Sequence, residues 1–79
     1  MIEIEIYVPG LRQESRLMEW RSQMDLLPQV RYKIDAYHDL VYFEIAEPGQ
    51  VSLNELTESF TSIGITPRVV GQVPDALSH

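Results

Sequence analysis

The sequence contains no cysteine among its 79 residues, so it can form no disulfide, no thiolate metal site and no cysteine nucleophile. Basic residues are also scarce, since six Lys and Arg stand against twelve Asp and Glu for a formal charge of -6. This balance repels nucleic acid and anionic lipid headgroups, and it disfavours both as partners. No apolar run approaches the ~20 residues of a membrane span, and the N-terminus lacks the pattern of a signal peptide. We therefore expect an acidic, cytoplasmic protein.

The remaining composition is that of a globular chain, with 44% hydrophobic and 23% charged residues and only four Gly and five Pro. A chain of this length buries enough apolar surface to fold, but it is too short for two separate cores. We expect a single domain over residues 1–79, with its core at 2–73 and a short C-terminal tail at 74–79.

The first third of the chain shows a change of hydrophobic period. Residues 2–8 alternate apolar and polar side chains, which is the pattern of a strand with one buried face. After Pro9 and Gly10, from about Leu11, apolar residues recur every three or four positions up to Leu27. This spacing predicts an amphipathic helix that ends at the following proline.

The rest of the chain predicts a hairpin, a second helix and a last strand. Residues 30–37 and 41–46 alternate apolar and polar side chains and are joined by a turn at 38–39. A helix should start at Ser52, because Ser52 and Glu55 have the spacing of a capping box. Residues 65–73 form a looser strand, which Pro67 places at an edge of the sheet.

This order predicts an α+β fold, the ferredoxin-like βαββαβ sandwich. Right-handed crossovers give a four-stranded antiparallel sheet with strand order 4-1-3-2 and two helices on one face. The other face of the sheet is then open to solvent. It should carry mainly polar and aromatic side chains, namely Glu3, Glu5, Tyr7, Arg31, Lys33, Asp35, Tyr37, Tyr42, Glu44 and Arg68.

The predicted open face indicates neither catalysis nor RNA binding. Tyr7 and Tyr42 could stack bases, but Glu3, Glu5 and Glu44 on the same strands would repel the phosphates. A close pair among these carboxylates could act as a general acid, yet solvent and neighbouring basic side chains favour an ordinary charged surface. No serine lies in a nucleophile-elbow motif. We therefore do not expect an enzyme.

Three segments of the chain share a pattern with a known family: residues 9–17 with Trp20, Met24, Leu27, Pro28 and Val30, then residues 52–56, and then residues 63–70. These segments resemble the heavy-metal-associated domain of copper chaperones and metal-transporting ATPases. In that family a strand enters a loop of sequence G-M-x-C-x-x-C, and the helix that follows ends in a leucine-proline-glycine-valine turn. The likeness spans roughly residues 2–73, although Gln29 replaces the usual glycine and the hairpin is one residue short.

The resemblance places the family's metal loop on this chain without its ligands. The family's glycine and methionine fall on Gly10 and Leu11, and its two cysteines fall on Gln13 and Arg16. The family binds soft cations such as Cu(I) through two thiolates, which an amide and a guanidinium cannot replace. Arg16 would also place a positive charge where the cation lies in the family. The resemblance therefore implies no bound metal and no cofactor.

The resemblance implies a second property, the docking of one such domain against another around this loop. The docking surface would be formed by Leu11, Arg12, Gln13 and Arg16, with the edge of Trp20. This interpretation is a small non-catalytic interaction module with a degenerate metal site, which binds a protein partner or a second copy and neither nucleic acid nor membrane. Two alternatives remain open: a metal-binding or metal-transport protein that uses Met and His ligands, and a small-molecule-sensing regulatory domain that acts as a dimer.

Overall fold

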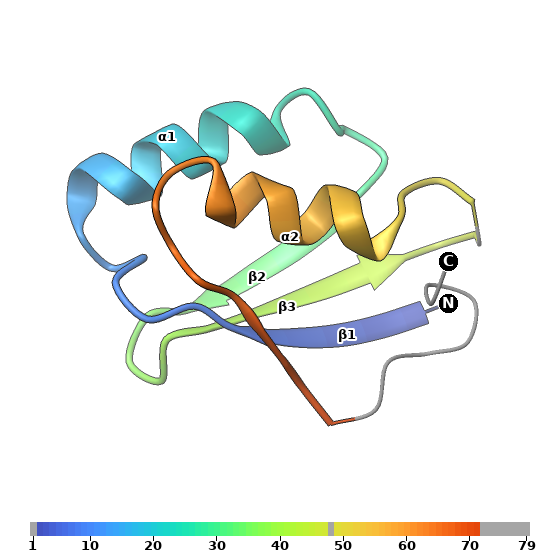
Figure 1. Ribbon diagram of the computed structural model, residues 1–79. Helices are drawn as coiled ribbons and strands as arrows, with labels where there is room; N and C mark the ends of the chain where they lie inside the picture. The colour runs from blue at the N-terminus through green and yellow to red at the C-terminus, as the bar shows by residue number, and fades with distance from the viewer. Residues whose placement is uncertain (1, 48, 72–79) are drawn as a thin grey trace.

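The computed structural model describes residues 2–47 and 49–71, and these residues form one sheet covered by two helices on the same face (Figure 1). The elements along the chain are β1 (Ile2–Tyr7), α1 (Glu14–Met24), β2 (Arg31–Asp35), β3 (Leu40–Ile45), α2 (Leu53–Thr61) and β4 (Arg68–Val70). The antiparallel sheet has the order β2-β3-β1-β4, which is the predicted 4-1-3-2 order in reverse. The ferredoxin-like prediction is therefore confirmed.

The strand register arranges the open face in rows that run across the sheet. The first row holds Arg31, Glu44 and Glu3, on β2, β3 and β1 respectively. The second row holds Lys33, Tyr42, Glu5 and Val70, and the third holds Asp35, Leu40, Tyr7 and Arg68. Cations of β2 and carboxylates of β1 thus lie on opposite sides of β3.

The open face differs from the prediction at three positions. Leu40 and Val70 belong to it, because each shares a row with side chains that point away from the helices. Tyr37 does not belong to it, because β2 ends at Asp35 and Tyr37 lies in the β2–β3 turn. The last strand is shorter than the predicted 65–73, and the tail at 74–79 lies outside the described residues.

The two helices start in different ways. α2 begins after the predicted capping box, in which Glu55 N–H donates to Ser52 Oγ and Ser52 N–H donates to Glu55 Oε1, both at 3.1 Å. α1 begins at Glu14 rather than near Leu11, because tight turns occupy residues 9–13: Leu11 N–H donates to the Val8 carbonyl and Gln13 N–H to the Gly10 carbonyl. No side chain caps the start of α1.

The core lies between the sheet and the helices, and Trp20 is at its centre. The indole is fully buried, stacks on Phe60 at a centroid distance of 5.1 Å, and meets Tyr32 edge to face at 4.7 Å. Its Nε1 donates a hydrogen bond of 2.9 Å to Ser59 Oγ, so the polar atom of the indole is satisfied. Trp20 therefore ties α1 to α2 through both packing and a hydrogen bond. Among the described residues, neither helix is long and apolar enough to cross a membrane.

Candidate functional site

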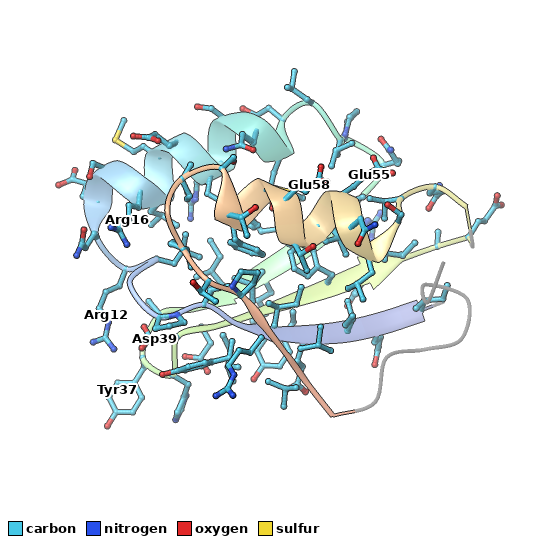
Figure 2. The ribbon with its side chains drawn as sticks, viewed as in Figure 1. Arg12, Arg16, Tyr37, Asp39, Glu55 and Glu58 are labelled. Carbon is cyan, nitrogen blue, oxygen red and sulfur yellow. The ribbon has the colours of Figure 1, made fainter. Side chains whose placement is uncertain are left out.

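The β1–α1 loop, residues 8–13, contains most of the residues that the sequence singled out. Gly10 has a φ of 95°, a region that side chains strongly disfavour, and it lets the chain turn directly after Pro9. The loop continues into the first turn of α1, where Arg16 lies. Figure 2 shows Arg12 and Arg16 at this end of the molecule.

Arg12 fastens the loop to the turn between β2 and β3. Its Nε and Nη2 donate to the two carboxylate oxygens of Asp39 at 3.1 and 3.0 Å, a bidentate ion pair between residues far apart in the sequence. The hydrogen bond and charge of Asp39 raise the pKa of Arg12, so the guanidinium stays cationic. Asp39 itself has a φ of 56°, and its carbonyl accepts from Val8 N–H at 2.7 Å. The β2–β3 turn is thus held to the loop by side chain and backbone together.

Arg16 reaches back from α1 over the loop. Its Nη1 would lie 3.0 Å from a Cβ placed on Gly10, so the guanidinium rests directly against the bare backbone of this glycine. In the alignment suggested by the resemblance, Arg16 is also the position of the second metal-binding cysteine. The space in front of Gly10 is therefore filled by a fixed positive charge.

The β2–β3 turn adds aromatic side chains that the sequence analysis did not assign to this site. Tyr37 is 85% exposed and meets the His38 ring edge to face at 4.8 Å. His38 is held by Asp35, with Nδ1 2.8 Å from Oδ2 and the backbone N–H donating to Oδ1 at 3.2 Å. Figure 2 shows Tyr37 at the same end as Arg12 and Asp39. The loop-and-turn surface consists of Arg12, Gln13, Arg16, Tyr37 and His38.

Two predicted members of the docking surface are wrong. Leu11 is only 3% exposed, because the turn at Gly10 directs its side chain into the core. Trp20 has no exposed edge, since aromatic rings of the sheet and of α2 enclose it. The predicted docking residues Arg12, Gln13 and Arg16 do lie together, with Gln13 at the N-cap of α1.

The other residues that could bind a metal ion do not lie close together. Met24 is buried, while Met18 is 63% exposed on another side of the same helix. Within residues 2–47 and 49–71, no three His, Asp or Glu side chains are placed to hold a metal ion. Glu3 and Glu44 do lie directly opposite each other, as the sequence suggested, but on an open face.

No known protein family matches the sequence, and no curated protein does. Among solved structures, the fold is similar to that of a copper-binding domain from HMA7, a P-type ATPase. The TM-score is 0.71 at 12% sequence identity, and the match covers 90% of this chain and 96% of that chain. The likeness confirms the predicted heavy-metal-associated type of fold.

Proposed function

We propose that this domain is a non-catalytic protein-interaction module with a heavy-metal-associated type of fold, and that its loop binds a protein partner instead of a metal ion. The observation that carries the proposal is the arrangement of arginines at the loop. Arg12 is paired with Asp39, and Arg16 lies over Gly10. Arginines therefore occupy the loop onto which the resemblance places the metal-binding motif of heavy-metal-associated domains.

The donor set argues against a soft cation at this loop. Gln13 offers a neutral amide, and Arg16 has no lone pair to donate and carries a permanent charge. Cu(I) is held by thiolates or thioethers, and Met18 follows Arg16 by two residues in α1, which places its side chain about 200° around the helix from Arg16. The residues present at the loop do not fit the metal that the fold suggests.

The composition of the loop-and-turn surface supports docking. Arg and Tyr are enriched among the residues that anchor protein interfaces, and Tyr37, which is 85% exposed, offers its ring to a partner. The Arg12–Asp39 pair holds the surface rigid, which lowers the entropy lost on binding. Asp39 neutralises Arg12, so Arg16, which has no ion pair among the described residues, is the cation that an acidic partner would recognise on this acidic chain.

Anaerobic Cu(I), Zn(II) and Ni(II) titrations test the metal part of the proposal. We expect wild-type affinities weaker than about 1 μM for each ion. The variant Gln13→Cys with Arg16→Cys supplies two thiolates at helix spacing, and it should gain Cu(I) affinity that either single change lacks. Tight binding by the wild type would contradict the proposal, whereas a folded double variant with no gain would show that the loop differs from the family's metal loop.

A photo-reactive residue in place of Gln13 tests the docking part. It should capture a defined partner, and the same residue in place of Glu58 on α2 is the control. The purified partner should bind wild type and Arg21→Ala alike, and it should bind Arg16→Ala about tenfold more weakly, as expected for loss of one interface anchor. Equal binding to both arginine variants would show that the partner uses another face.

A further inference from the structure

We propose that the open face of the sheet is a self-complementary interface that pairs two copies of this chain face to face. This inference concerns the side of the molecule opposite the helices, and it does not depend on the loop-and-turn surface. It rests on the strand register, which fixes where each charge lies relative to the central strand β3. The lower side of the sheet in Figure 1, which no described helix covers, is the face in question.

In the first two rows of the face, the charges of the outer strands are divided by strand. Arg31 and Lys33 point from β2, whereas Glu3 and Glu5 point from β1. β3 separates these strands, so cation and carboxylate are about two strand spacings, ~10 Å, apart within one copy. No ion pair within 4.0 Å links the four side chains in the described structure, in contrast to the Arg12–Asp39 and His38–Asp35 pairs. Their charges therefore remain available to a second molecule.

A two-fold axis that runs parallel to the strands and above β3 places each of these four charges opposite a charge of the other sign in the second copy. Rotation about this axis lays β2 of one copy over β1 of the other and keeps each row at the same height. Arg31 then faces Glu3 of the second copy, and Lys33 faces Glu5, each pair occurring twice. Sheets that pack face to face keep their strands within about 30° of each other, which is compatible with this alignment.

The side chains on the axis agree with the same arrangement, with one exception. Tyr42 meets its own copy in the second row, and Leu40 does so in the third, which buries an aromatic and an apolar side chain that are half-exposed in one copy. Glu44 also meets its own copy, which is unfavourable. Arg31 lies beside Glu44 in the same row and offsets part of this repulsion.

The size of the face predicts a weak, reversible dimer. Three strands of each copy, β2, β3 and β1, face the other copy, while β4 lies beyond the overlap. At a spacing of ~4.8 Å and about five residues per strand, the facing area is about 14 by 17 Å. Two such faces amount to roughly 500 Å² in total, below the ~1,000 Å² of a standard specific interface. We expect a dissociation constant of about 100–500 μM, which increases with salt because the ion pairs are screened.

Sedimentation analysis from about 1 to 500 μM tests the interface in the full chain. Lys33→Glu sets a new carboxylate against Glu5 of the second copy, and Glu5→Lys places two ammonium groups together. Each change should weaken self-association about tenfold or more. The controls change the charge equally on the helices: Arg21→Glu matches the first variant, Glu58→Lys matches the second, and both should remain within about twofold of wild type.

Mixing the two variants gives the decisive measurement. An equimolar mixture of Lys33→Glu and Glu5→Lys should form a heterodimer at wild-type strength, because every facing pair is then of opposite sign. The chain that carries both changes should form a homodimer for the same reason. Glu44→Gln should tighten the dimer, since it removes like charges that meet at the axis. The inference is overturned if the wild type is monomeric throughout, if the mixture and double variant do not recover, or if the helix controls weaken association equally.

Discussion

The hydrogen bond from Trp20 to Ser59 offers a sharp test of how the two helices are joined. Ser59 Oγ accepts from Trp20 Nε1 at 2.9 Å and donates to the Leu56 carbonyl, and both side chains are almost completely buried. Ser59→Ala leaves the indole N–H without a partner, at a cost of about 1–3 kcal/mol. Alanine regains about 0.5 kcal/mol of helix propensity. The expected net loss in free energy of unfolding is about 0.5–2.5 kcal/mol, and the midpoint of thermal unfolding should fall by roughly 2–20 °C.

Urea unfolding monitored by tryptophan fluorescence measures this loss. Ser22→Ala is the matched control, because Ser22 also lies in a helix and also donates to a carbonyl of its own helix, but it is exposed. The control should stay within about 0.5 kcal/mol of wild type, and the slope with urea should not change in either variant. A similar effect of both substitutions would show that the loss comes from the helix and not from the indole.

A double-mutant cycle with Trp20→Phe isolates the hydrogen bond itself, with unfolding monitored by circular dichroism. Phenylalanine has no N–H, so Ser59→Ala should cost much less in the Trp20→Phe background than in wild type. The coupling free energy between the two positions should be about 1 kcal/mol or more. A coupling below about 0.3 kcal/mol would refute the claim that this contact stabilises the core.

Phe60→Ala should lower the free energy of unfolding by about 3–5 kcal/mol, because it removes a fully buried ring that stacks on Trp20, and denaturant unfolding would show this loss. Glu3→Gln should raise it by about 0.2–1 kcal/mol, because Glu3 lies opposite Glu44, and no gain in the same assay would argue against the register. Gly10→Ala should cost about 1–2 kcal/mol through its φ of 95°, also measured by denaturant unfolding. Hydrogen bonds from His38 lower the pKa of Asp35, so the stability that Asp35 contributes is present above the usual carboxyl value of 3.8 and is lost as pH falls through the folded pKa. The stability difference between wild type and Asp35→Asn, followed by acid titration of unfolding, should therefore shrink toward zero at low pH.

The fold could be predicted from the sequence because its main determinants are local. The alternation in residues 2–8 identifies β1, and the capping box at Ser52 marks the start of α2 almost to the residue. With two helices and four strands in this order, the handedness of crossovers leaves few possible topologies. Hydrophobic period, turn residues and connection rules thus agree with one another, as they must for a small domain that folds to one structure.

The position of Leu11 could not be predicted in the same way. Its place in the chain is a loop next to Gly10, and the resemblance matches it to the methionine of the metal loop, which placed it on the predicted docking surface. In the structure, two successive tight turns direct this side chain into the core beside Val8. The direction of one loop side chain depends on the dihedral angles of the residues around it, and no hydrophobic period specifies those angles.

Local sequence patterns predict the two candidate surfaces to different extents. The loop-and-turn surface depends on the pairing of Arg12 with Asp39, which are 27 residues apart, and nothing in the sequence around either residue indicates the other.

The rows of the open face can be predicted in part from the sequence. A short turn after Asp35 fixes the pairing of Asp35 with Leu40, and hence the pairing of Lys33 with Tyr42. The pairing of Glu5 with Tyr42 is set by contacts between β1 and β3, which the whole of α1 and β2 separates along the chain. A shift of two residues in that pairing would keep every apolar side chain on the core face, yet it would leave only one of Glu3 and Glu5 in a row with Arg31 or Lys33. The proposed self-complementarity is therefore a property of the register between β1 and β3, and it becomes visible only once that register is known.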